Sequence, residues 1–381
     1  MSLTELPPSN VDPASTPVTP ATSNGPVGQE PGARLSVILD RVNRVLLGDT
    51  AEELLVPDGP QDAVSDGSFI PIARRTLQET GLLEGEVSSL VVKLLLHMGA
   101  ISGGKAAGHI GLTFSVMSTL LKQMKDDQLV AYKGDAPAGD YVYELTQKGR
   151  ERAISCSAAS TYFGAAPVPL QQYIDSVSAQ SLKRRQPTYQ EIRTAFADID
   201  LQPSLLERIG QAIHSGRGMF LFGSPGNGKT SIGERVTKSF GDHIWIPRAI
   251  TASGDLFRLY DPNTHQMVDP GVNPTSYDQR WVKICRPTVV VGGELQMENL
   301  EVRYISKTGV GEAPVQLKSN CGTLLIDDFG RQRMSTDELL NRWIVPLEQH
   351  HDFLQHQRSC LQAWPDSAQL RNRAACWTTG R

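Results

Sequence analysis

The stretch LFGSPGNGKT at residues 221–230 has the residue types and the spacing of a phosphate-binding loop. Gly223 is followed, after four residues, by Gly228, Lys229 and Thr230. The glycines of this pattern let backbone N–H groups surround a polyphosphate, and the lysine reaches its β and γ oxygens. The residues expected to contact the nucleotide are Gly223, Ser224, Pro225, Gly226, Asn227, Gly228, Lys229, Thr230 and Ser231. The alternative interpretation is an ordinary glycine turn.

The residues on either side of the loop favour the first interpretation. Residues 219–222 (MFLF) are a short apolar run that predicts a buried strand. Ile232, Val236 and Phe240 then recur at helical spacing. A phosphate-binding loop requires a strand before it and a helix after it, because the free N–H groups at the start of the helix face the phosphate.

A second motif, CGTLLIDDFG at residues 321–330, ends an apolar run with two carboxylates. Residues 324–326 predict a buried strand, which Asp327 and Asp328 follow directly. We expect Thr230 to bind Mg²⁺ and Asp327 to hold it, while Asp328 lies where a carboxylate that activates water belongs. The expected catalytic residues are Lys229 and Asp328, and the expected metal-binding residues are Thr230 and Asp327. The alternative interpretation is a strand that merely ends in two aspartates at a turn.

Composition limits the classes of protein to be considered. A chain of 381 residues has room for about two or three domains, and 39% hydrophobic with 20% charged residues is typical of soluble globular proteins. The net charge of -4 argues against nucleic acid bound over the whole surface. The five cysteines show no C-x-x-C spacing, so we expect neither a zinc site nor a disulfide framework, and a cytoplasmic location fits. No apolar run has the length of a membrane span.

The segment before the phosphate-binding loop changes its hydrophobic period. Apolar residues at helical spacing predict helices around 90–95, 102–112 and 113–127. Residues 129–133 and 141–145 then alternate with a period of two and predict a hairpin. Three helices followed by a two-stranded wing resemble a winged-helix domain.

A winged helix can bind DNA or dock a protein. The third helix, within residues 113–128, would present its polar face to the major groove. That face consists of Ser115, Ser118, Thr119, Lys122 and Lys125. It carries only two lysines, and Asp126 and Asp127 lie at its end, whereas phosphate neutralisation dominates the affinity for DNA. The charges therefore favour protein docking over DNA contact.

Composition and pattern together predict the order of the segments. Residues 1–33 carry seven of the 24 prolines and almost no large apolar side chains, so they cannot bury enough surface to fold. The predicted organisation is a disordered leader at 1–33, a short helical segment and linker at 34–65, a winged-helix-like domain at 66–153, a linker at 154–186, a core with both motifs at 187–354 and an atypical tail at 355–381.

The motifs GSPGNGKT and GTLLIDDFG, with the helical segments that lead into them, resemble ATPases of the AAA+ class. SNCGTLLIDDFGRQRMSTDELLNRWIVPLEQ is similar to the matching part of MoxR-like and enhancer-binding-activator ATPases, and the layout with VVVGGELQMENL resembles bacterial predicted AAA+ ATPases. The resemblance implies an α/β P-loop NTPase core with a parallel sheet, in which the two motifs are Walker A and Walker B. It implies ATP and Mg²⁺ as cofactors and ATP hydrolysis by a homo-oligomeric ring that remodels a partner. The positions that match the motif residues of the class, and to which the resemblance assigns their roles, are Gly223, Gly228, Lys229, Thr230, Asp327 and Asp328.

The chain departs from this class in two places. The class usually has Glu where Asp328 stands, and Asp is one methylene shorter, so slow hydrolysis is expected. Residues 355–381 contain no apolar run that predicts a central strand. We therefore expect the polar sensor, the arginine finger and the helical lid of the class to be missing, through a truncation, a frame shift or a disordered natural tail. Arg331, Arg333 and Arg342 are candidates for nucleotide or subunit contacts, and none is assigned as the finger.

Several alternatives stay open. Between the motifs we expect the second strand of the class near residues 243–250, and a surface loop or partner-contacting loop at 306–320. Three functions compete: a partner-remodelling ATPase, a nucleotide-dependent regulator that docks DNA or protein through the winged-helix-like domain, and a small-molecule kinase. The DDFG carboxylates argue against the kinase.

Overall fold

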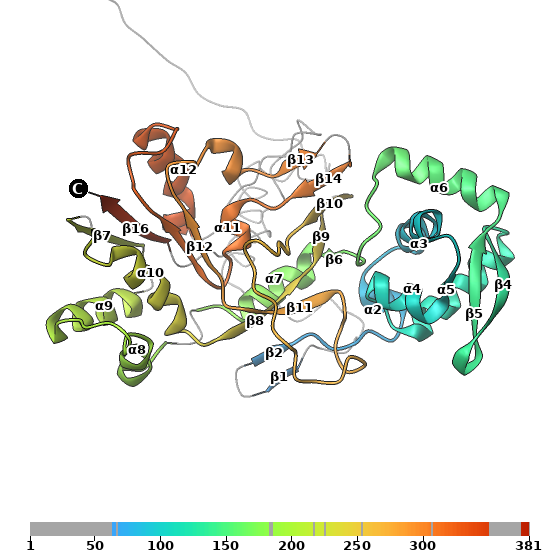
Figure 1. The fold of residues 1–381 in the computed structure, drawn as a ribbon, viewed down its shortest axis with the longest axis horizontal. Coiled ribbons are helices and arrows are strands. Elements are labelled where there is room, and N and C mark those ends of the chain that lie inside the picture. Colours follow the sequence, from blue (N-terminus) through green and yellow to red (C-terminus); the bar gives the residue numbers. More distant parts are fainter. Residues whose placement is uncertain are drawn as a thin grey trace, which may run out of the picture. The chain divides into compact units, whose positions relative to one another are not determined.

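The computed structural model describes residues 63–65, 68–182, 186–215, 218–224, 226–252, 254–305, 308–349 and 375–380 (Figure 1). The predicted leader at 1–33, most of the segment at 34–65, Pro225 and residues 350–374 lie outside these residues. The described part is a mixed α/β structure whose sheets include parallel strands. None of its helices is long and apolar enough to cross a membrane.

A helical module with a small antiparallel sheet comes first. Its elements are α2 (Leu77–Thr80), α3 (Glu84–Met98), β3 (Ile101–Ser102), α4 (Gly103–Ile110), α5 (Phe114–Asp126), β4 (Val130–Ala136), β5 (Asp140–Leu145) and α6 (Gln147–Ala159). Val87, Leu94, Ile110 and Met117 are fully buried in one core. The predicted helices and hairpin are present, and β3 adds a third strand in the order β3-β5-β4.

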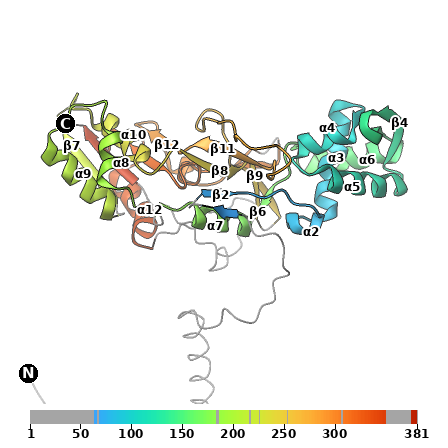
Figure 2. The same cartoon turned by 90° about the horizontal axis from the view of Figure 1, so that it is seen from below.

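A second module is built around a five-stranded mixed sheet in the order β13-β14-β10-β9-β6. Its elements are β6 (Val168–Pro169), α7 (Leu170–Ala179), β8 (His243–Pro247), β9 (Ala249–Ala252), β10 (Asp255–Arg258), β11 (Trp281–Cys285), the 3₁₀ helix η2 (Met297–Leu300), β13 (Arg303–Ile305), β14 (Val310–Glu312) and α11 (Val315–Lys318). Tyr173 and Val177 of α7 share a core with Ile246 of β8 and Ile250 of β9 (Figures 1 and 2). A hairpin of β1 (Ala63–Ser65) and β2 (Ser68–Ile70) adds Phe69 to a cluster with Trp245 and Trp281.

Arg280 joins the first two modules. Its guanidinium is fully buried and pairs with Asp278 at 2.7 Å. It also donates to the carbonyl oxygens of Thr80 at 3.1 Å and Pro167 at 3.3 Å. Because a buried charge is tolerated only when it is paired and hydrogen-bonded, these contacts fix the end of α2 against the turn at 278–280.

Two segments that were predicted as connections belong to the core. The predicted linker at 154–186 is wrong, since α6, β6 and α7 occupy most of it and Tyr173 is only 1% exposed. The predicted loop at 306–320 is also wrong, because it contains β14 and α11 and buries Val310 and Leu317. In both segments, short apolar stretches lie between prolines and small residues, and this local pattern is typical of a loop. The apolar side chains nevertheless pack against other elements of the fold.

His265 lies buried in the second module in a single tautomer. Its Nδ1 accepts the Asp261 N–H at 3.1 Å, so Nε2 carries the proton and donates to the carbonyl oxygen of Lys318 at 2.8 Å. Burial lowers the pKa of His265 below its usual value. Below about pH 6.5 the unfolded chain takes up a proton that the folded state takes up only at lower pH, so the free energy of unfolding should fall as the pH is lowered through this range.

Urea denaturation checks this pH dependence. Wild type and His265→Gln are compared at about pH 7.5 and about pH 5.5, on either side of the ordinary histidine pKa. The glutamine cannot take up the proton, so its stability should fall less on acidification. An equal loss in both proteins would contradict the prediction.

The third module carries both sequence motifs on a four-stranded parallel sheet in the order β12-β15-β16-β7. Its elements are α8 (Tyr189–Ala195), α9 (Pro203–Ser215), β7 (Met219–Gly223), α10 (Lys229–Lys238), β12 (Thr288–Val291), β15 (Thr323–Ile326), α12 (Thr336–Gln349) and β16 (Ala375–Gly380). Leu339 and Trp343 of α12 pack with Leu324 of β15, and Ile232 of α10 packs with Ile209 of α9.

Two expectations about the strands of this sheet are corrected. The neighbours of β15 are β12 and β16, whereas the residues near 243–250 belong to β8 and β9 in other sheets. The apolar runs at residues 243–250 and 288–291 both predict a strand, and only long-range pairing decides which strand joins the sheet. The prediction that residues 355–381 contain no central strand is also wrong, because β16 lies between β15 and β7. A strand with a neighbour on each side gains ladder hydrogen bonds at both edges, so a short segment suffices.

The strand before the phosphate-binding loop is present as β7, but it is not buried. Phe220 is 51% exposed and Phe222 is 85% exposed, whereas Met219 and Leu221 pack against the core of α8, α9 and α10. Successive side chains of a strand point to opposite faces, so one face of β7 meets these helices and the other is exposed. Phe220 contacts Phe329 edge to face at 6.1 Å between ring centroids.

Candidate phosphate-binding site

Both sequence motifs lie at one edge of the parallel sheet. Gly223 ends β7, Asp327 follows β15, and β16 lies between these strands with Gly380 opposite Gly223. The carboxyl ends of parallel strands share one edge, which is where ligands bind in open α/β sheets. The fold thus brings together residues that are 97 positions apart, Thr230 and Asp327.

Two glycines give the loop between β7 and α10 its shape. Gly226 and Gly228 have φ angles of 84° and 69°, a left-handed conformation that other residues rarely adopt. Gly228 is also the N-cap of α10, and no side chain caps this helix in the described part of the chain. The first-turn N–H groups of α10 can therefore receive an anion.

The Lys229 side chain lies along the loop. Its Nζ donates to the carbonyl oxygens of Gly223 and Ser224, each at 3.1 Å. Both acceptors are neutral, whereas the oxygens of a bound polyphosphate would be charged and would form stronger hydrogen bonds with the ammonium. The lysine is thus held where a phosphate could take over its contacts.

The other predicted contact residues surround this lysine. Ser224 and Asn227 are exposed in the loop, and the Asn227 N–H donates to the carbonyl oxygen of Ser224 at 3.4 Å. Ser231 is half-buried in the first turn of α10, where its carbonyl oxygen accepts a bond from Arg235 at 2.8 Å.

A hydrogen bond joins the two motifs. Thr230 Oγ1 donates to Asp327 Oδ2 at 2.7 Å, and the Asp328 N–H donates to Asp327 Oδ1 at 2.9 Å. A hydroxyl beside a carboxylate suits Mg²⁺, which takes oxygen ligands and usually keeps several waters. No group of three or more His, Cys, Asp or Glu side chains that could hold a metal occurs among the described residues. An ion here would therefore take most of its ligands from phosphate and water.

Asp328 differs from Asp327 in its surroundings. Its backbone has a φ of 50°, in the left-handed region, and its side chain is 51% exposed. The Arg331 Nη1 lies 3.9 Å from Asp328 Oδ2, in an exposed ion pair that contributes little to stability. A carboxylate that is open to water in this way can accept a proton from a water molecule.

The helix that follows the loop is anchored to the sheet by hydroxyl groups. Thr237 of α10 bonds to Thr323 of β15, and Thr288 of β12 bonds to Thr237, each at 2.7 Å. At the other side of α10, Arg235 forms two bonds with Asp198 at 2.7 and 2.6 Å, which lower the pKa of that carboxyl. These contacts fix α10 relative to the strand that carries the carboxylates.

The three candidate arginines have different environments. Arg342 is 16% exposed at its side chain and is held by Glu301 at 3.1 Å, so it serves α12 packing. Arg331 pairs with Asp328, and Arg333 is exposed. Sequence reasoning missed Gln332, which lies between these two arginines and bonds to the backbone of the Asp327 turn. An amide side chain after a turn carries no signal of its own in a single sequence.

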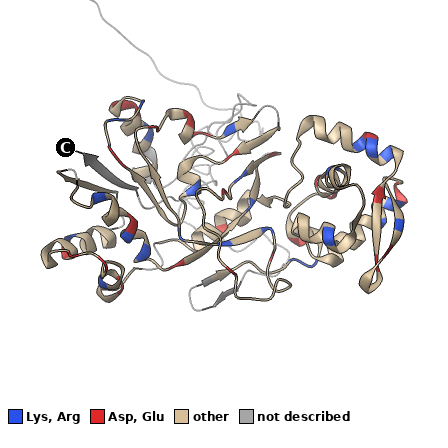
Figure 3. Cartoon of the chain, viewed as in Figure 1, with Lys and Arg blue, Asp and Glu red and all other residues tan. Residues whose placement is uncertain are grey.

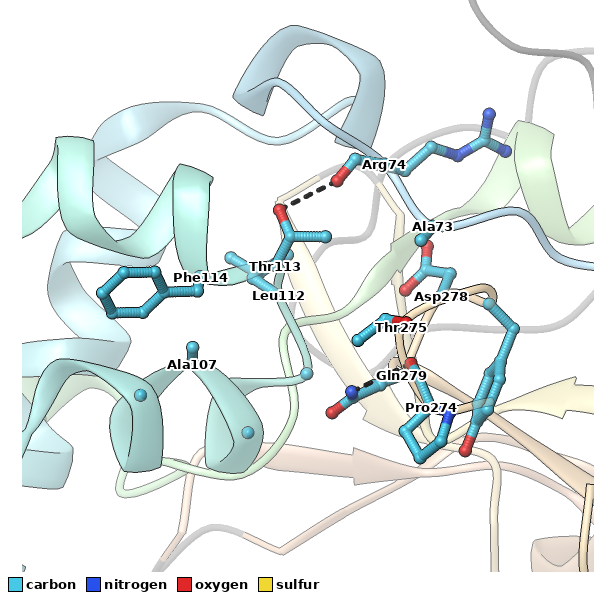
Figure 4. A pocket seen from close by; sticks show the side chains of 14 residues that line it. Ala73, Arg74, Ala107, Leu112, Thr113, Phe114, Pro274, Thr275, Asp278 and Gln279 are labelled. Atoms are coloured by element: carbon cyan, nitrogen blue, oxygen red, sulfur yellow. Dashed lines mark hydrogen bonds between the residues drawn. The ribbon is translucent and has the colours of Figure 1, made fainter. Parts of the chain in front are cut away.

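A separate cavity of about 270 Å³ lies between the start of α5 and the turn at 274–279 (Figure 4). The Thr113 hydroxyl donates to the carbonyl oxygen of Arg74 at 3.0 Å, and the Gln279 amide donates to that of Pro274 at 3.1 Å. These polar groups on the lining bond to the chain itself. The cavity shares no residue with the phosphate-binding loop.

The polar face predicted on α5 is exposed and of mixed charge. Lys125 Nζ lies 4.3 Å from the centroid of the Tyr132 ring on the hairpin, and Lys122 is exposed. Residues of both charges occur on α5, α6 and the β4–β5 hairpin (Figure 3). On α5 the two lysines of the polar face are followed by Asp126 at the end of the helix.

Comparisons with known proteins give no further guidance. No protein-family model matches the chain, and no curated protein matches its sequence.

Proposed function

We propose that this protein is a P-loop ATPase of the AAA+ type that binds ATP with Mg²⁺ and hydrolyses it. The observation that supports this most is the 2.7 Å hydrogen bond from Thr230 to Asp327. It joins the Thr230 hydroxyl after the glycine-rich loop to the Asp327 carboxylate after β15, which supports reading the two motifs as Walker A and Walker B. A glycine turn that only reverses the chain does not require a hydrogen bond to the Asp327 carboxylate.

Each residue of the site has a role in this proposal. The loop N–H groups and Lys229 hold the phosphates, and Thr230 with Asp327 holds the metal. Bound Mg²⁺ supplies positive charge that neutralises the phosphates. Asp328 orients the attacking water and accepts its proton.

The proposal includes a partner. Hydrolysis by a homo-oligomeric ring would remodel a protein that docks on the helical module, since the mixed charge of α5 suits protein better than DNA. The alternative is a nucleotide-dependent regulator that uses the same module to contact DNA or protein.

A titration with a fluorescent ATP analogue and a phosphate-release assay test the proposal. We expect saturable binding that is stronger with Mg²⁺, and slow release of phosphate. Absence of binding would rule out the proposal. Binding without release, with or without duplex DNA, would favour the regulator, and transfer of phosphate to an acceptor would identify a kinase.

A further inference from the structure

The turn after β15 is held by a side chain that lies outside both motifs. Gln332 Nε2 donates to the carbonyl oxygens of Asp327 at 3.0 Å and Asp328 at 3.1 Å. Its Oε1 accepts the Gly330 N–H at 2.7 Å. Both polar atoms of this half-buried amide are thus directed to the backbone of one turn.

The turn needs such support because of its backbone conformation. Asp328 has a φ of 50° and Gly330 a φ of 92°. A left-handed conformation is costly at a residue other than glycine, such as Asp328, unless its surroundings hold it. The Arg331 N–H also donates to the Asp328 carbonyl oxygen at 2.9 Å, so this carbonyl accepts two hydrogen bonds.

One peptide unit connects Gln332 to the Asp327 carboxylate. The carbonyl of the peptide between Asp327 and Asp328 accepts a bond from Gln332, and the N–H of the same peptide donates to Asp327 Oδ1. The other carboxylate oxygen accepts the Thr230 hydroxyl. If the peptide rotated, the carboxylate would lose its backbone bond and turn away from Thr230.

We propose that Gln332 is a positioning residue for the metal site, which fixes the Asp327 carboxylate toward Thr230 by clamping the peptide that follows it. The inference rests on the proposed function and adds a residue to it. Groups that orient a metal-binding carboxylate typically change metal affinity by about 10- to 100-fold when they are removed. The effect of Gln332 should therefore appear in the Mg²⁺ dependence of nucleotide binding.

Titration of a fluorescent ATP analogue, with and without Mg²⁺, tests the clamp. In Gln332→Ala the factor by which Mg²⁺ strengthens binding should fall about tenfold, with little change in binding without Mg²⁺. Gln332→Glu keeps the size of the side chain but loses both donor bonds, so it should lose at least as much. Gln123→Ala, at an exposed position of α5, is the matched control and should behave as wild type.

Hydrogen exchange gives a readout that does not need nucleotide. The Gly330 N–H should exchange faster in Gln332→Ala than in Gln332→Glu, which retains an acceptor oxygen.

The outcomes separate the two proposals. In one outcome, wild type binds the analogue and Mg²⁺ strengthens binding by the same factor in both variants as in wild type. This result would overturn the positioning role of Gln332 and leave the proposed function standing. If wild type binds no nucleotide, both the proposed function and the positioning role of Gln332 are overturned. Loss of binding without Mg²⁺ together with lower thermal stability would show a structural role only, which also overturns the clamp.

Discussion

Lys229→Ala should weaken the binding of Mg²⁺-ATP about a hundredfold, which corresponds to about 2.7 kcal/mol. Lys229 is held along the loop by two carbonyl oxygens at 3.1 Å, in reach of any phosphate that the loop binds. Hydrogen bonds from an ammonium to charged oxygens contribute about 1.5 to 3 kcal/mol. The substitution removes these bonds together with the charge. A fluorescent-nucleotide titration measures the loss.

Two further measurements make this prediction specific. The thermal unfolding midpoint of Lys229→Ala should stay near that of wild type, because the Lys229 ammonium bonds to carbonyl oxygens of its own loop. Lys238→Ala removes an exposed lysine at the end of the same helix and should bind nucleotide as wild type does. Equal affinities in wild type and Lys229→Ala would exclude the phosphate-binding interpretation of the loop.

Local patterns predicted the parts of the fold that local interactions determine. The change from helical spacing to alternation predicted the three helices and the hairpin of the first module. The glycine spacing predicted a turn, and Gly226 and Gly228 do adopt left-handed conformations there. In these places the conformation of each residue depends on its neighbours in sequence.

Pairing between distant strands could not be predicted in this way. The second strand of the core was expected near residues 243–250, but the parallel neighbours of β15 are β12 and β16. Phe222 belongs to an apolar run and is 85% exposed, whereas its neighbour Leu221 packs against the helices of the module. A run of apolar residues shows that a strand is favourable and does not show which faces will be covered.

The site depends on both kinds of information. The residue types of Thr230 and Asp327 follow from the motifs, and their 2.7 Å contact follows only from the order of the parallel strands. For Gln332, by contrast, the sequence gives no motif, and the role that we propose rests on its three hydrogen bonds to the turn. Sequence patterns therefore indicate the donor groups, while the fold decides which of them act together.

Asp328→Asn should reduce ATP turnover about a hundredfold and leave Mg²⁺-ATP binding unchanged, if Asp328 accepts the proton of the attacking water. Asparagine has nearly the same shape and adopts left-handed backbone readily, so the φ of 50° at this position can be kept. The Asp328 N–H bond to Asp327 is a backbone contact and is kept too. The amide, however, is not basic and cannot take the proton.

Asp327→Asn should act on the preceding step, which makes it the control for Asp328→Asn. The Asp327 carboxylate bonds to Thr230 and to the Asp328 N–H through separate oxygens, so an amide keeps the second bond with its oxygen, can meet the Thr230 hydroxyl only as a donor, and offers less charge to a metal. The Mg²⁺ dependence of binding should therefore fall in Asp327→Asn and remain in Asp328→Asn. Single-turnover phosphate release at saturating nucleotide separates the two effects. Turnover in Asp328→Asn equal to that of wild type would show that another group activates the water.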